Sequence, residues 1–306
     1  MQKTMKKDTG LNAGLKESGL SEAGLSRRGF LGALGAGLGV TTMAFAERAF
    51  AAGEAEAGKF AFASRPGAKA ILFDASKCVG CHYCEGNCRN TNELPAEVTF
   101  NIKALPETVL PRLMIPPEMR DALASVQPIT EDDRTAERYL RVVQKTLGSP
   151  DGEEARSVNA RKACTHCGIC AQVCPAKALL SRDDGIVAVN ADKCIGCFYC
   201  QMACPFDIPR YRTEGEDKAV QKCIGCGGLV DEEQSPACVA GCPVDALSFG
   251  AYDDMVTAGQ KAVSELLAKG YPDANLYGAR ELGGMGVVNI LAYKPRAYGL
   301  PELPAR

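Results

Sequence analysis

Short apolar runs separated by turn-forming residues predict the strands of this chain. Val, Ile and Leu dominate these runs, and β-branched and other apolar side chains favour a pleated, half-buried surface. Asp184-Gly185 lies between two of them and predicts a β-hairpin, because Asp-Gly suits the tight turns that join antiparallel strands. The predicted strands are residues 70–74, 139–147, 178–181, 186–190, 246–250 and 286–293.

One segment has the periodicity of an amphipathic helix. From residue 253 to residue 269 apolar side chains recur three or four positions apart, and Gly270 then predicts the end of the helix. Residues 298–304 contain one glycine and two prolines and are expected to be extended. Residues 253–306 are therefore predicted to form a C-terminal helix, a strand and an extended tail.

A basic pair precedes a weakly apolar stretch near the N-terminus. Residues 26–31 read Ser-Arg27-Arg28-Gly-Phe-Leu, and a glycine-rich apolar segment follows. This is similar to a twin-arginine (Tat) export signal. Two Ala-Phe-Ala boxes predict cleavage after Ala46 or Ala51. Residues 1–51 are thus predicted to be a Tat signal peptide and residues 52–69 a linker, and the alternative is a chance arginine pair before a buried helix.

Sixteen cysteines fall into four runs that leave none over. The third run reads C-x2-C-x2-C-x3-C-P, the bacterial ferredoxin pattern in which thiolates hold a 4Fe–4S cluster and the fourth cysteine serves a second cluster. The first run has the same spacing without the proline, the second has the same spacing with it, and the fourth is stretched. The runs are Cys78, Cys81, Cys84 and Cys88; Cys164, Cys167, Cys170 and Cys174; Cys194, Cys197, Cys200 and Cys204; and Cys223, Cys226, Cys238 and Cys242.

The crossing of fourth cysteines between neighbouring runs predicts four 4Fe–4S clusters. The second and third runs are neighbours and exchange their fourth cysteines, and the first and fourth runs are then left to pair. The predicted ligand sets are Cys78, Cys81, Cys84 and Cys242 for cluster 1; Cys223, Cys226, Cys238 and Cys88 for cluster 2; Cys164, Cys167, Cys170 and Cys204 for cluster 3; and Cys194, Cys197, Cys200 and Cys174 for cluster 4.

Two other uses of the cysteines compete with this interpretation. Disulfides are the usual explanation of an even cysteine count in an exported chain, but C-x2-C-x2-C packs the thiols too closely for long-loop cross-links. The fourth run alone would also pass as a zinc site. His82 and His166 lie inside the runs and are expected to donate hydrogen bonds or pack there, because the thiolates already supply the ligands.

The pairing of runs predicts an α+β fold of two ferredoxin-like dicluster modules, one nested within the other. The outer module is residues 70–160 and 215–252, and the inner module is residues 161–214. Residues 89–160 lack cysteine and form a predicted long loop insertion, which is either a surface wrap or a docking surface for a partner.

Charge and motifs exclude several functions. The net charge is -2, so the chain lacks the basic balance of a nucleic-acid-binding protein. No G-x-S-x-G, H-E-x-x-H or Walker motif is present, and with two histidines the chain offers few groups for acid–base catalysis. We therefore expect no catalytic site. No apolar run after residue 304 is long enough to span a bilayer.

From residue 77 to residue 304 the chain resembles the four-cluster iron–sulfur subunits of molybdopterin oxidoreductase and NiFe-hydrogenase complexes. The order of the runs, the stretched fourth run and the ending Gly283-Gly-Met-Gly-Val-Val carry the resemblance, which looks closest to periplasmic hydrogenase-2 and formate dehydrogenase subunits. The second run departs from the family, which often has a four-residue gap there, and the C-terminal membrane anchor of many relatives is absent.

The resemblance implies a periplasmic subunit, exported folded, that relays electrons between a catalytic oxidoreductase subunit and an integral membrane quinone-reactive subunit or cytochrome. Two rival classes are a self-sufficient soluble iron–sulfur reductase and a zinc-structured binding module. The first would need a flavin or another substrate site, and the second would contain zinc in place of iron.

Overall fold

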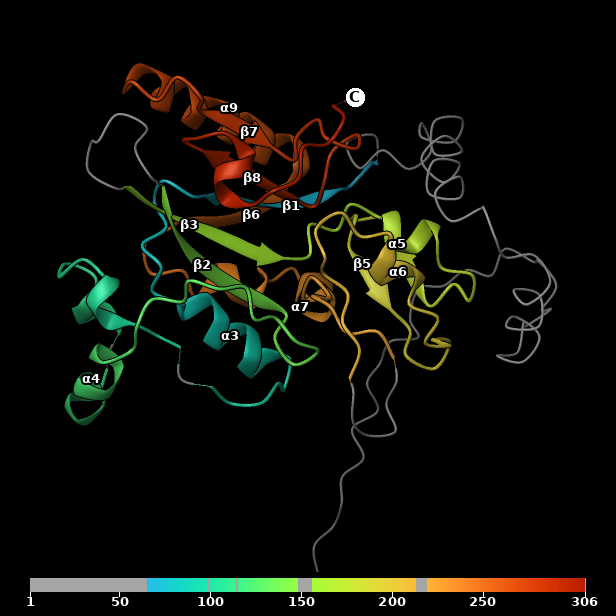
Figure 1. Ribbon diagram of the computed structural model, residues 1–306, viewed down its shortest axis with the longest axis horizontal. Helices are drawn as coiled ribbons and strands as arrows, with labels where there is room; N and C mark the ends of the chain where they lie inside the picture. Colours follow the sequence, from blue (N-terminus) through green and yellow to red (C-terminus); the bar gives the residue numbers. More distant parts are fainter. Residues whose placement is uncertain (1–64, 98, 114, 148–155, 213–218, 306) are drawn as a thin grey trace, which may run out of the picture. The chain divides into compact units, whose positions relative to one another are not determined.

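The computed structural model describes residues 65–305, except 98, 114, 148–155 and 213–218 (Figure 1). These residues all belong to one compact unit, Gly39–Arg306. The predicted Tat signal, with Arg27, Arg28 and the cleavage candidates Ala46 and Ala51, lies outside the described residues, as does most of the linker 52–69.

A mixed four-stranded sheet contains three of the predicted strands. Its order is β6-β1-β8-β7, where β1 is antiparallel to β6 and parallel to β8. The strands predicted at 70–74, 246–250 and 286–293 are confirmed, and the short strand β7 was not predicted. The bounds are β1 Lys69–Asp74, β6 Leu247–Ala251, β7 Asn275–Tyr277 and β8 Val287–Leu291.

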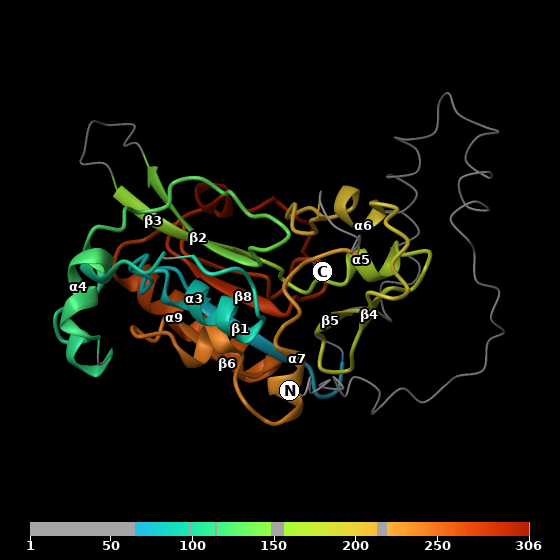
Figure 2. The same cartoon turned by 90° about the horizontal axis from the view of Figure 1, so that it is seen from below.

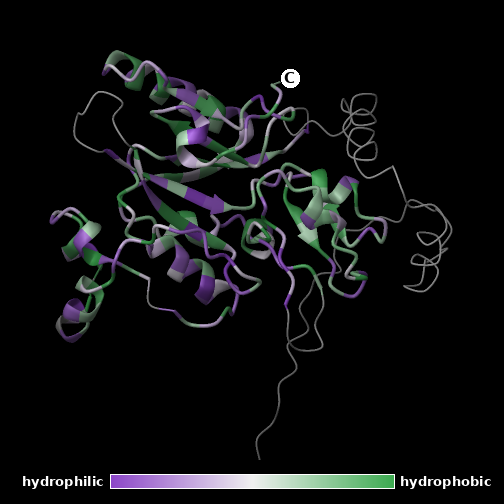
Figure 3. Cartoon of the chain, viewed as in Figure 1, coloured by the Kyte–Doolittle hydropathy of each residue, from purple (hydrophilic) through white to green (hydrophobic). Residues whose placement is uncertain are grey.

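The sheet separates two cores, because successive side chains of β1 point to opposite faces. Ala70 and Leu72 pack with helix α9, Tyr252–Ala268, which lies against one face of the sheet (Figure 1). Ile71 and Phe73 belong to the other core, which also contains Cys88 and Cys238. The helix predicted at 253–269 is confirmed, and Figure 3 shows hydrophobic and hydrophilic residues mixed along it, as expected of a helix with one buried side.

A long antiparallel ladder occupies part of the predicted insertion. Strand β2, Leu140–Leu147, confirms the strand predicted at 139–147, and it pairs along its whole length with β3, Arg156–Ala163. The predicted module boundary at residue 160 therefore falls inside β3. Three short helical segments precede the ladder: η2 Ile102–Ala104, η3 Leu110–Leu113 and α4 Pro117–Ala124.

The predicted hairpin is also confirmed. Strands β4, Leu179–Ser181, and β5, Val187–Val189, are antiparallel, and Gly185 takes the left-handed conformation that the turn requires. Helices α5, Ile169–Gln172, and α6, Tyr199–Met202, lie beside this hairpin in both views (Figure 1, Figure 2). Each is a single turn that carries one cysteine.

Three more helices carry cysteines or follow them. These are α3, Tyr83–Thr91, α7, Gly227–Asp231, and α8, Ala237–Ala240. Helix α3 continues past Cys88 because Arg89, and not proline, follows that cysteine. The tail bends through η4, Pro295–Tyr298, and is then irregular up to a bridge between Glu281 and Ala305. None of the helices in the described part of the chain combines the length and apolar character that a membrane crossing needs.

Gly278, directly after β7, tests how closely the sheet edge is packed. Its φ is +97°, and a Cβ there would lie 2.5 Å from the Val287 carbonyl oxygen. Gly278→Ala should therefore lower the melting temperature more than Gly270→Ala, since Gly270 has φ +90° but open space around it. The control Gly270→Ala should lose only the stability that an alanine in the left-handed conformation costs, about 1–2 kcal/mol. Equal losses in anaerobic thermal unfolding would contradict this packing.

Candidate metal centres

The four cysteine runs share one backbone feature. The residue before the second cysteine has a left-handed φ in every run: 70° at Gly80, 53° at His166, 66° at Gly196 and 66° at Gly225. Glycine adopts this conformation without a steric cost, whereas the histidine costs about 1–2 kcal/mol. In the second and third runs the first two cysteines line the same cavity.

Backbone amides donate hydrogen bonds to these sulfurs in a repeated pattern. In two runs the amide two residues after the first cysteine points at its sulfur, with His166 N 3.4 Å from Cys164 Sγ and Gly225 N 3.4 Å from Cys223 Sγ. The amide four residues after a fourth cysteine does the same, at 3.2 Å for Cys174 and 3.5 Å for Cys204. Donors aimed at sulfur suit thiolates, which accept hydrogen bonds.

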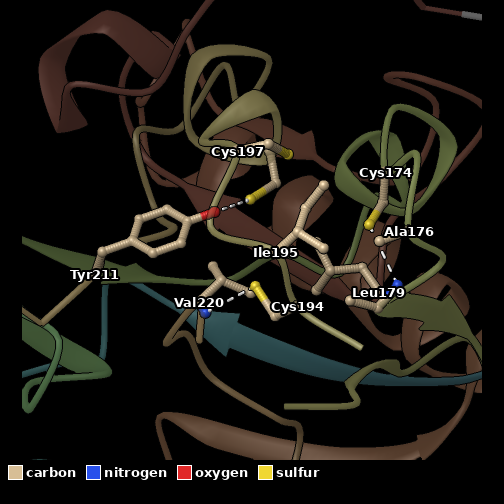
Figure 4. A pocket seen from close by; sticks show the side chains of 10 residues that line it. Cys174, Ala176, Leu179, Cys194, Ile195, Cys197, Tyr211 and Val220 are labelled. Atoms are coloured by element: carbon tan, nitrogen blue, oxygen red, sulfur yellow. Dashed lines mark hydrogen bonds between the residues drawn. The ribbon is translucent and has the colours of Figure 1, made fainter. Parts of the chain in front are cut away.

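One cavity lies between the second and third runs and is lined by four cysteines from both (Figure 4). Cys194, Cys197 and Cys200 come from the third run, and Cys174 comes from the end of the second. Figure 4 shows Tyr211 on one side of this cavity and Cys174 on the other. The Tyr211 hydroxyl is 3.1 Å from Cys200 Sγ, and its ring lies against Phe198, with 4.2 Å between the ring centroids.

A second cavity has the reciprocal composition. Cys164, Cys167 and Cys170 of the second run line it together with Cys204 from the end of the third. Lys222 and His166 also line it, and both side chains are buried. Lys222 donates to the carbonyl oxygens of Val187 and Cys223, so it is not a solvated surface lysine.

The first and fourth runs meet where helix α3 packs against helix α8. Asn87 of α3 donates to the Ala237 carbonyl oxygen, and a Cβ on Gly241 would overlap the Asn87 side chain. This close approach brings cysteines of one run next to cysteines of the other. Cys242 lies near Cys78 and Cys81, and Cys88 lies near Cys223, Cys226 and Cys238.

All sixteen cysteines are in the described part of the chain, free of disulfides, and buried or half-buried. Burial raises the pKa of Cys78 and of Cys167 to about 12, with neighbouring thiols adding to both increases. Burial also raises the pKa of Cys81 and of Cys226 to about 11. A metal centre that binds these sulfurs must therefore displace their protons.

Two histidines inside the runs take part in hydrogen bonds to the protein. His82 is buried, and its Nδ1 is 2.9 Å from Glu85 Oε1. The Nδ1 of His166 accepts a hydrogen bond from the Val187 amide at 3.0 Å, so its proton is on Nε2. Burial holds the pKa of His166 well below its usual range, and Nε2 has no partner among the described residues. That nitrogen belongs to a residue lining the second cavity and can donate into it.

Sequence reasoning missed the charged residues buried near the thiols. Arg141 Nη1 is 2.6 Å from Glu85 Oε2, and the Val142 amide donates to the other Glu85 oxygen at 2.6 Å. Glu97 and Asp133 also contact Arg141. The available signal was Glu85 itself, a carboxylate between two cysteines of one run, because a buried carboxylate needs a cationic partner.

The arrangement fits 4Fe–4S clusters better than single metal ions. Among the described residues no three or more His, Cys, Asp or Glu side chains are close enough together to hold a single ion. The thiols are instead spread around cavities, with amide donors behind them. When bound there, such clusters supply reversible one-electron redox chemistry, and the protein supplies thiolates, hydrogen bonds and a dry environment.

Comparison with known families places two domains on this chain. A 4Fe-4S dicluster domain matches residues 74–178, and another matches residues 158–252. Together they include every cysteine of the four runs. The fold and the thiol-lined cavities therefore define an iron–sulfur protein with two ferredoxin-like 4Fe–4S dicluster domains.

Curated relatives identify the group more closely. The formate dehydrogenase-O iron-sulfur subunit of Escherichia coli K12 is 33% identical over 77% of this chain and 71% of its own length. The nitrate-inducible formate dehydrogenase iron-sulfur subunit of that organism is 32% identical over 77% and 73%. The B component of its anaerobic dimethyl sulfoxide reductase is 32% identical over 60% and 74%. The protein belongs to the family of iron–sulfur subunits that includes the formate dehydrogenase subunits.

Tyr211→Phe tests whether the hydroxyl donates to a ligated sulfur. A thiolate that binds iron can only accept, so the Tyr211 hydroxyl should stabilise the added negative charge on reduction. The variant should make one cluster potential more negative and leave the iron content unchanged. Tyr252→Phe is the control, since its hydroxyl donates to the Ala279 carbonyl oxygen in a core without cysteine. Redox titration measures both, and an unchanged set of potentials in Tyr211→Phe would refute this role.

Proposed function

We propose that this protein is the electron-transfer subunit of a periplasmic oxidoreductase complex. It relays single electrons through four 4Fe–4S clusters between a catalytic subunit and a membrane partner. The observation that carries the proposal is the gathering of cysteines from different runs around shared cavities, three from one loop and one from another. Family membership supports the electron-transfer role, since the formate dehydrogenase relatives are named iron–sulfur subunits of an oxidoreductase.

The two inner ligand sets follow the cysteines that line each cavity. Cys164, Cys167, Cys170 and Cys204 would hold one cluster, and Cys194, Cys197, Cys200 and Cys174 would hold the next. Cys78, Cys81 and Cys84 with Cys242, and Cys223, Cys226 and Cys238 with Cys88, would hold the outer two. Besides burial, Cys242 raises the pKa of Cys78, and Cys223 and Cys238 raise the pKa of Cys88. These interactions between runs support the outer sets.

Contacts between ligand sets support a relay. Besides burial, the pKa of Cys84 is raised by Glu85 and by Cys78, and also by Cys238 of the adjacent set. The pKa of Cys164, which belongs to a third set, is raised by burial and by Cys223, a member of the same set as Cys238. Thiols of different sets thus lie close enough to interact, which suits tunnelling from one cluster to its neighbour.

The pairing of β1 with β6 supports a nested arrangement of the two domains. β1 precedes the first cysteine run and β6 follows the fourth, so the sheet joins the two ends of the proposed outer module. The inner hairpin β4–β5 and its cysteines lie between them in sequence. The proposed outer module is residues 70–160 and 215–252, the inner module is 161–214, and 89–160 is an insertion.

The partners follow from the relatives and remain part of the proposal. A formate dehydrogenase or a related molybdopterin enzyme is the catalytic partner that the relatives support best. A NiFe-hydrogenase is the alternative catalytic partner. An integral membrane quinone-reactive subunit or a cytochrome would exchange electrons at the far end. The protein needs no catalytic site of its own in this role.

Metal analysis with two reciprocal variants tests the proposed clusters. Purified anaerobically, the protein should contain about sixteen iron and sixteen acid-labile sulfides per molecule. Cys204→Ser should change the spectrum of the cluster held by Cys164, and Cys174→Ser should change that of the cluster held by Cys194. Zinc in place of iron would overturn the proposal, as would turnover of a small-molecule substrate by the isolated protein. If Cys204→Ser leaves the Cys164 cluster intact, the crossed ligand sets are wrong.

Export is tested by replacing both arginines of the N-terminal pair. Arg27→Lys with Arg28→Lys should keep the protein in the cytoplasm, since the Tat pattern depends on the arginine pair. The clusters should still assemble, because the Tat route carries proteins that fold before export. Fractionation and N-terminal sequencing of the wild type should find a periplasmic protein cleaved after Ala46 or Ala51. An equal distribution of variant and wild type would count against a working signal.

A further inference from the structure

Arg161, in strand β3, is a buried cation placed among cysteine sulfurs. Its side chain is 8% exposed, and Nη2 is 3.8 Å from Cys238 Sγ. Its Nε has no hydrogen-bond partner among the described residues. A buried guanidinium is costly unless an anion compensates for the water that it loses.

No carboxylate compensates Arg161 within the described part of the chain. Other buried arginines show the usual solution: Arg141 contacts Glu85, Glu97 and Asp133, and Arg134 contacts Asp132. The neighbours of Arg161 are instead sulfurs. Burial opposes its charge, yet Cys238, Cys223 and Cys84 raise the pKa of Arg161 above its usual value. The guanidinium in turn opposes the increase in pKa that burial and neighbouring thiols impose on Cys88.

These sulfurs belong to two different ligand sets. Cys84 is in the proposed set with Cys78, whereas Cys223, Cys238 and Cys88 form the adjacent set. The hydrogen bond to Cys238 places Arg161 against one set, and its electrostatic interaction with Cys84 extends to the other. A 4Fe–4S core held by four thiolates is an anion, and each reduction adds one electron and one negative charge. The guanidinium already carries its proton, so reduction requires no proton transfer at this residue.

We propose that Arg161 is a positioning residue for electron transfer: it is the counter-cation shared by the two outer clusters, and it favours their reduced forms. The inference rests on the proposed function. In a dry site a fixed positive charge acts on nearby anions with little screening, so it should raise both potentials. It should also reduce the repulsion between the two clusters when both are reduced.

The test compares Arg161→Gln, Arg161→Lys and Lys162→Gln in the full-length protein. Lys162 is the next residue of β3, but its Nζ donates to the carbonyl oxygens of Tyr298 and Gly299 at 3.0 and 2.7 Å. Lys162→Gln therefore removes a charge from the same strand without removing a neighbour of the sulfurs. Iron and sulfide content measures assembly, and redox titration followed by electron paramagnetic resonance measures the potentials.

In Arg161→Gln the ratio of reduced to oxidised protein at a fixed potential should fall about tenfold for both outer clusters, equivalent to about 59 mV for one electron. In Arg161→Lys this ratio should fall less, and in Lys162→Gln it should equal the wild-type ratio. If Arg161→Gln fails to assemble but Arg161→Lys assembles with near-normal potentials, the need for the charge is also supported.

Three results would overturn the inference. One is an unchanged set of potentials in a fully loaded Arg161→Gln protein. Another is a shift confined to the two inner clusters. The third is failure of both Arg161 variants to assemble while Lys162→Gln does, which would make the side chain a packing element. Normal cluster content in the wild type keeps the proposed function intact in each case.

Discussion

The structure depends on bringing sixteen thiols into the interior and turning them toward shared cavities. Burial makes these groups hard to ionise, as the raised pKa values of Cys78 and Cys167 show. A metal centre that binds the sulfurs offsets the free-energy cost of ionising these buried thiols. The single-turn helices α5, α6 and α8 are too short to be stable alone, so thiolate ligation and the packing around it must hold them.

Hydrogen bonds and charges from the protein surround the cysteine thiols. Amides point at Cys164, Cys174 and Cys204, and the Tyr211 hydroxyl lies against Cys200. Buried cations are divided into two kinds. Arg141 is matched by carboxylates, whereas Arg161 has no carboxylate partner in the described part of the chain and donates to the Cys238 sulfur. This difference separates an arginine that secures the fold from one that acts on redox centres.

The β-structure outside the cysteine runs joins distant parts of the chain. The pairing of β1 with β6 holds the start of the first cysteine run near the end of the fourth. Helix α9 covers the face of their sheet that points away from the cysteines. The β2–β3 ladder brings Arg141 and Arg161 to the outer cysteines. Residues 89–160 are thus more than a loop in the described region, because their strand β2 carries a residue that contacts the first run.

Local sequence by itself determined the cysteine spacing, the strands β1, β2, β6 and β8, the Asp-Gly hairpin and helix α9. Each of these depends on turn chemistry, side-chain periodicity or ligand spacing that lies within a few neighbouring residues. Tertiary structure alone decided that β3 crosses the expected boundary at residue 160, that Lys222 is buried, and that Arg161 meets Cys238. Burial and charge pairing depend on residues tens of positions away, and no local pattern in a single sequence records them.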